Sequence, residues 1–123
     1  MTNDILKTIK IENYIWIIYI LIIILCFYSN YQEANYYKYN DLYAKEKYRQ
    51  ANIIIFSTVF LVYLYFFVNS LESISNLTES TNKEKVYFEN LNFIATTLVL
   101  IAGAIFLYIA ISDKNLETEI AFS

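Results

Sequence analysis

Apolar and polar positions in this chain are separated into long blocks instead of alternating at a helical or strand period. Three blocks contain no Asp, Glu, Lys, Arg or His, and they cover residues 13–29, 51–71 and 91–112. A helix needs about 20 mostly apolar residues to cross a hydrocarbon core roughly 30 Å thick. Helices of a soluble bundle would carry a polar stripe at the 3.6-residue period, and these blocks have none. The pattern predicts an all-α membrane protein with three transmembrane helices.

The connections predict continuous helices in up-down-up order within one three-span membrane domain, residues 1–123. The chain has no proline and one glycine, so broken spans, which use these residues to interrupt a helix, are not expected. Residues 72–90 are expected to form a polar loop, and residues 113–123 an acidic tail. The sequence TNKE at 81–84 fits a capping box, so we expect the third helix to start near Asn82 and reach about Asn115.

Residues 30–50 are predicted to extend the first two helices past the bilayer as an antiparallel helical hairpin. The sequence YNDLY at Tyr39–Tyr43 is the expected turn, because Asn and Asp favour turns and helix caps. Helical spacing places two sets of residues on the faces that are expected to meet: Phe27, Tyr31 and Ala34 on the first arm, and Ala44, Tyr48, Ala51 and Ile55 on the second. We expect inward tyrosines along this seam.

Tyrosine is concentrated in the hairpin. Seven of the 13 tyrosines lie between Tyr28 and Gln50, together with four Lys or Arg residues. Packing along the seam accounts for some of these rings, and the headgroup region, which favours amphipathic rings, accounts for Tyr28, Tyr31 and Tyr48. Four tyrosines remain as a candidate docking surface for a partner: Tyr36, Tyr37, Tyr39 and Tyr43.

Small residues recur every seven positions in the third block, at Thr96, Gly103 and Ala110. Small side chains on one stripe let another helix approach closely in lipid. Two interpretations stay open. The stripe can pack against the first or second helix of the same chain, or it can contact a partner protein or a second copy.

Charge and composition exclude several function classes. The formal net charge is −3, so no basic face is expected for nucleic acid. With one cysteine, Cys26, and no histidine, neither an intramolecular disulfide nor a zinc site is expected, and no cofactor is predicted. The chain has no Gly-rich phosphate loop and no carboxylate inside a span, so we expect a protein that is not an enzyme. Transport is also not favoured, because transporters mark their pathway with ionisable groups inside the membrane.

The predicted location is a cell membrane, as a multi-pass protein. Lys7 and Lys10 precede the first span as in a signal peptide, but no small-x-small cleavage pattern follows, so we interpret the span as an uncleaved anchor. Basic residues are nearly balanced between the two sides. Three of them directly precede the second span and Glu72 follows it, which favours residues 30–50 and the C-terminus on the cytoplasmic side. The high usage of Ile, Asn, Tyr, Lys and Phe is typical of AT-rich coding, for which a bacterium or a virus is the expected source, and the predicted location is the bacterial plasma membrane.

Two functions follow from these features. The first is a non-enzymatic membrane protein that acts by contact, as an accessory subunit, a scaffold or an immunity-type protein, with the bilayer and a membrane protein or a second copy as partners. The second rests on a resemblance. In span count and size the chain is similar to three-span phage holins, which implies a homo-oligomeric protein that permeabilises membranes. The resemblance covers the hydropathy of the whole chain and no motif, and the acidic C-terminus SDKNLETEIAFS departs from the basic tail usual in that group.

Overall fold

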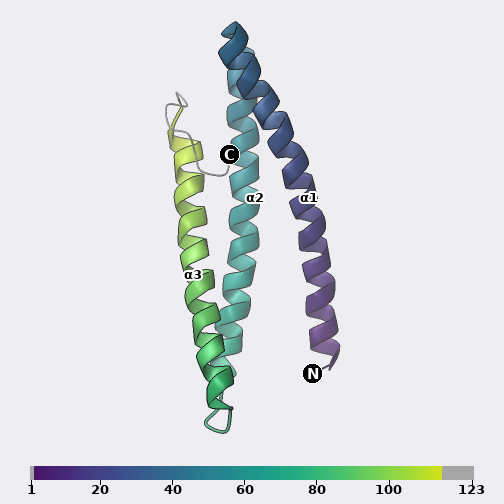
Figure 1. The fold of residues 1–123 in the computed structure, drawn as a ribbon, viewed down its shortest axis with the longest axis vertical. Coiled ribbons are helices and arrows are strands. Elements are labelled where there is room, and N and C mark those ends of the chain that lie inside the picture. The colour runs from purple at the N-terminus through teal and green to yellow at the C-terminus, as the bar shows by residue number, and fades with distance from the viewer. Residues whose placement is uncertain (1, 115–123) are drawn as a thin grey trace. The chain divides into compact units, whose positions relative to one another are not determined.

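The computed structural model describes residues 2–114, which form three long helices (Figure 1). They are α1 (Thr2–Tyr39), α2 (Leu42–Ser75) and α3 (Lys83–Ser112). Their 38, 34 and 30 residues correspond to lengths of about 57, 51 and 45 Å at 1.5 Å per residue. Each helix is long and apolar enough to cross a membrane. The predicted fold class, all-α with three candidate membrane spans, is confirmed.

The chain divides into two compact parts, and the division falls within α2, between Ile55 and Phe56. In the first part α1 forms a hairpin with the start of α2, and in the second part the remainder of α2 forms a hairpin with α3 (Figure 1). The three predicted spans lie within the three helices. Of the predicted acidic tail, only Asp113 and Lys114 are among the described residues.

A tight turn joins α1 to α2 at Asn40 and Asp41. Asn40 has a φ of 50°, a left-handed conformation that Asn tolerates better than most residues. Asp41 then caps α2, because its Oδ1 accepts hydrogen bonds from the backbone N–H groups of Tyr43 (3.0 Å) and Ala44 (3.3 Å). The turn predicted at Tyr39–Tyr43 is confirmed.

The α2 side of the first hairpin buries the face that its spacing predicts. The buried residues of this arm include all four of the predicted set: Ala44, Tyr48, Ala51 and Ile55. Ala44 and Ala51 have small side chains, and the large ring of Tyr48 lies between them in the sequence of this face. A four-three-four spacing was therefore sufficient to identify the buried face of α2.

The α1 side of the same hairpin was predicted incorrectly. Phe27 and Tyr31 are 71% and 63% exposed and Ala34 is exposed as well, whereas Ser29 is buried. For Phe27 and Tyr31, which belong to the uncharged run of α1, the physical reason is the surrounding medium. Apolar spacing marks a buried face where the alternative is water, but lipid accepts apolar side chains on the outside, so a polar group gains more from facing inward.

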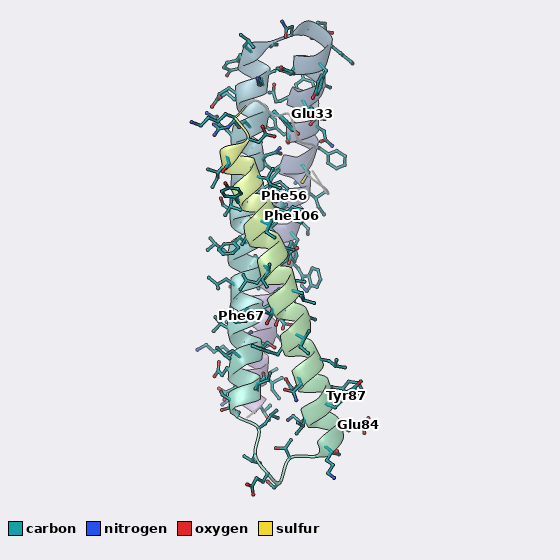
Figure 2. All side chains as sticks on the ribbon, turned by 90° about the vertical axis from the view of Figure 1, so that its left-hand side faces the viewer. Glu33, Phe56, Phe67, Glu84, Tyr87 and Phe106 are labelled. Atoms are coloured by element: carbon teal, nitrogen blue, oxygen red, sulfur yellow. The ribbon has the colours of Figure 1, made fainter. Side chains whose placement is uncertain are left out.

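Aromatic pairs hold the second hairpin together. Phe56 of α2 and Phe106 of α3 have ring centroids 5.9 Å apart, and Figure 2 shows them side by side. Nearer the connecting loop, Phe67 and Phe93 have ring centroids 5.6 Å apart. Tilted ring pairs at these distances contribute about 0.5–1.5 kcal/mol beyond the area that they bury.

The connection between α2 and α3 is shorter than the predicted polar loop. Helical structure covers 72–75 and 83–90, which leaves residues 76–82 as the non-helical segment. The residue that caps α3 is Asn82, whose side chain accepts from the backbone N–H of Glu84 at 2.8 Å. The capping box was predicted to start at Thr81, but the Thr81 hydroxyl accepts from the N–H of Thr78 inside the loop.

The predicted start of α3 near Asn82 is confirmed, whereas its predicted end at about Asn115 is wrong. The helix ends at Ser112, and the backbone N–H of Asp113 bonds to the carbonyl of Ile109. Ser112 is also the last residue of the uncharged block. Asn115 itself lies outside the described residues.

Candidate functional site

A buried hydrogen bond between two polar side chains joins the helices of the first hairpin. The Ser29 hydroxyl donates to Oδ1 of Asn52 over 2.9 Å, and both residues are buried. Each is separated from the Asn40–Asp41 turn by the same number of residues, so the bond joins positions at the same height on the two helices. In lipid such bonds contribute about 0.6–2 kcal/mol and fix the register of two helices.

The first prediction concerns this bond. Ser29→Ala is expected to lower the free energy of unfolding in detergent by about 1–2 kcal/mol, because Asn52 Oδ1 stays buried and loses its donor. Replacing both partners by apolar residues, as Ser29→Ala with Asn52→Leu, is expected to restore part of the loss.

Thr97→Val is the matched control, since the Thr97 hydroxyl donates to the carbonyl of Phe93 in its own helix at 2.7 Å. The idea of a register-fixing bond would be abandoned if Ser29→Ala and Thr97→Val had the same small effect.

Other hydroxyl and amide groups in the spans also bond within the protein. Nδ2 of Asn92 lies 3.4 Å from Oγ of Ser70, so α2 and α3 have a longer counterpart of the Ser29–Asn52 bond. The hydroxyl of Thr96 donates to the carbonyl of Phe93 over 3.1 Å. These bonds satisfy polar groups that would otherwise face hydrocarbon.

The residues of the small-residue stripe of α3 lie in two different environments, since Gly103 and Ala110 are buried and Thr96 is half-buried. Gly103 and Ala110 are buried, and a Cβ added at Gly103 would lie 2.8 Å from Cδ2 of Tyr63. Gly103 therefore lets α3 approach α2 closely, which is the intramolecular packing that the sequence left open. The contact of Gly103 and Ala110 with another protein stays a prediction.

Thr96, the first residue of the stripe, lies in an open groove. The groove lies between α2 and α3, has a volume of about 200 Å³, and is lined by Tyr63, Phe66, Ala95, Thr96 and Val99. Ala95 is exposed and Thr96 is half-buried, so small side chains form its α3 side. The two aromatic rings come from α2. Sequence analysis identified Thr96 but missed the aromatic side, because no pattern indicated which α2 residues face it.

The four candidate tyrosines lie around the turn of the first hairpin. Tyr36 is half-buried, whereas Tyr37, Tyr39 and Tyr43 are 68%, 73% and 68% exposed. The rings of Tyr36 and Tyr37 pack edge to face with centroids 5.1 Å apart. The four rings are thus close to the same turn, but their role in binding a partner stays a prediction.

Two lysines of α2 lie over these rings. Nζ of Lys45 is 5.4 Å from the ring centroid of Tyr36, and Nζ of Lys47 is 5.2 Å from that of Tyr43. The negative face of an aromatic ring attracts a cation by about 0.5–1 kcal/mol at exposed sites, so the rings orient both ammonium groups. Within residues 2–114, no group of three His, Cys, Asp or Glu side chains is placed to hold a metal ion.

The first charged residue after the α1 span is Glu33, which Figure 2 labels on the hairpin. It is half-buried, and its Oε2 is buried without a hydrogen-bond partner among the described residues. Arg49, the last charged residue before the α2 span, is also half-buried. Glu33 and Arg49 therefore mark the boundary between the uncharged segments of α1 and α2 and the charged end of the hairpin.

Comparisons with protein-family models, with curated proteins and with solved structures give no match. The assignment therefore rests on the chain's own features, which are three helices of suitable length and hydropathy and polar side chains bonded between and within them. On these grounds the protein is a small multi-span helical membrane protein.

Proposed function

We propose that the protein is a non-enzymatic membrane protein that acts by binding another membrane protein, as an accessory subunit, a scaffold or an immunity-type protein. The observation that carries the proposal is the groove between α2 and α3 that Tyr63, Phe66, Ala95, Thr96 and Val99 line. Its small α3 residues allow a further helix to approach closely, and close approach is the main source of helix affinity in lipid.

The position of the groove along the uncharged segments of α2 and α3 indicates which kind of protein could bind there. Ala95 and Val99 lie five and nine residues inside the uncharged segment that starts at Asn90, or about 8–14 Å along the helix. On α2, Tyr63 lies eight residues before the end of its uncharged segment at Leu71, about 12 Å. The groove thus opens inside the hydrocarbon layer, where a partner must offer a transmembrane helix.

The proposal includes an orientation, with residues 30–50 and the C-terminus in the cytoplasm of a bacterial cell. Its support is the cluster of basic residues directly before the second uncharged segment: Lys45, Lys47 and Arg49. Basic residues beside a span favour the cytoplasmic side.

The test is co-purification of the tagged protein, expressed at its native level and solubilised gently. Ala95→Leu is expected to reduce the recovery of a stoichiometric partner several-fold, because the added side chain fills the groove where the partner helix would approach. Ala104→Leu is the matched control, since Ala104 is exposed on the same helix, does not line the groove, and is nine residues away, which places it on the opposite face.

Other outcomes count against this proposal in different ways. Equal recovery of one partner by both variants would place the contact elsewhere on the molecule. Recovery of further copies of the same chain alone would favour the holin-like alternative. In that case, induced expression should collapse the membrane potential.

A further inference from the structure

The hairpin tip, defined as residues 33–49, exposes large side chains at its turn. Four of them are more than two-thirds exposed: Tyr37 at 68%, Tyr39 at 73%, Leu42 at 69% and Tyr43 at 68%. Large apolar and aromatic side chains that are exposed around one turn are typical of a surface that contacts a membrane or another protein. Tyrosine, with an apolar ring and a polar hydroxyl, is the residue type that the headgroup layer of a bilayer favours.

The height of the tip above the hydrocarbon matches one headgroup layer. Glu33 ends an uncharged run of 20 residues, 13–32, and Arg49 precedes an uncharged run of 22 residues, 50–71. Runs of this length cover about 30–33 Å, which is the thickness of the hydrocarbon core. From Glu33 to Tyr39 the helix rises a further 9 Å, roughly, while the headgroup layer on each side is about 5–8 Å thick.

The charges of the tip complement phosphate. The tip contains four cations and three carboxylates, a formal charge of +1, which leaves −4 for the remainder of a chain whose total is −3. Two of its carboxylates are engaged within the hairpin, Asp41 as the α2 cap and Glu46 with the side-chain amide of Gln50 at 3.3 Å. Lys45 and Lys47 instead lie over the rings of Tyr36 and Tyr43.

We propose that the hairpin tip is an anchor in the phospholipid headgroup layer, where Lys45 and Lys47 bind lipid phosphates while the tyrosine rings that they contact lie among the headgroups. The tyrosine rings near the turn lie at the level of the headgroups, and the long, flexible lysine side chains bring their ammonium groups to the phosphates. Anionic lipids strengthen the contact, because the tip is the positively charged part of an acidic chain. This anchor uses a surface separate from the groove of the proposed function and does not depend on it.

The test measures the depth of a single tryptophan at the tip. In the tip-reporter protein, the full chain carries Trp16→Phe, which removes its one natural tryptophan, together with Tyr39→Trp. The matched control, the loop-reporter protein, carries Trp16→Phe with Glu79→Trp, which places the tryptophan at an exposed position of the 76–82 loop. Both are reconstituted in vesicles of phosphatidylcholine, with and without phosphatidylglycerol.

The anchor predicts that acrylamide quenches the tip reporter several-fold less than the loop reporter, and that a headgroup-attached nitroxide quenches the tip reporter more. Adding Lys45→Gln with Lys47→Gln should raise acrylamide quenching of the tip reporter in the vesicles that contain phosphatidylglycerol. Equal acrylamide quenching of the two reporters would overturn the proposal and make the tip a water-exposed surface for a soluble protein. An unchanged depth in the double lysine variant would overturn the role of the two lysines.

Discussion

Tyr48→Asp is expected to destabilise the protein by about 3–5 kcal/mol, the range found when a large buried aromatic side chain is removed. Tyr48 is only 6% exposed and lies on the buried face of α2 with Ala44 and Ala51. Asp would leave the space of the ring empty and would place a carboxylate where water does not reach it, which adds to the cost. The measurement is the free energy of unfolding of the purified protein in detergent.

Tyr37→Asp is the matched control, because it makes the same chemical change on the same hairpin at a side chain that is 68% exposed. Its expected effect on stability is within about 0.5 kcal/mol, as for surface substitutions in general. Similar losses for the two variants would show that burial does not distinguish these tyrosines and would refute a seam built on Tyr48.

The contrast between the two arms of this hairpin shows how far the sequence predicts the fold. On α2, the spacing of Ala44, Tyr48, Ala51 and Ile55 identified the buried face, because small residues alternate there with large ones. On α1, the same use of apolar spacing selected Phe27, which is exposed. Hydrophobicity no longer separates inside from outside once the outside is lipid, and side-chain size and hydrogen bonding decide instead.

The Ser29–Asn52 bond was missed for a related reason. Each residue alone is a polar group near the end of an apolar run, and such groups often bond to their own helix. A signal was present, since the two positions are equally distant from the turn that the sequence did predict. Using the turn as the centre of the hairpin and pairing polar residues across it would have identified the bond.

The candidate site was predictable only in part. The seven-residue repeat of Thr96, Gly103 and Ala110 marked α3 as a helix that is approached closely, which agrees with the contact at Gly103. The repeat carries no information about which surface approaches. That depends on where the rings of Tyr63 and Phe66 lie on α2, and both rings occur in a run of aromatic residues with no distinguishing period.

Gly103→Leu is expected to destabilise the second hairpin by about 1–3 kcal/mol through overpacking. A Cβ alone at this position would lie 2.8 Å from Cδ2 of Tyr63 and 3.8 Å from Cδ2 of Phe60, so the larger side chain must displace a ring or separate the helices. Unfolding in detergent measures the loss. Ala104→Leu adds a side chain of the same kind at the next residue, which is exposed, and is expected to leave stability nearly unchanged.

A double variant tests whether the Tyr63 ring is the cause. Gly103→Leu with Tyr63→Ala should be more stable than the sum of the two single losses predicts, because each change makes room for the other. Strict additivity, or a Gly103→Leu variant as stable as Ala104→Leu, would contradict a close approach at this point. Glycine in a helix costs about 1 kcal/mol relative to alanine. The one glycine of this chain lies where an alanine Cβ would meet a ring, so close packing of α3 on α2 offsets that cost.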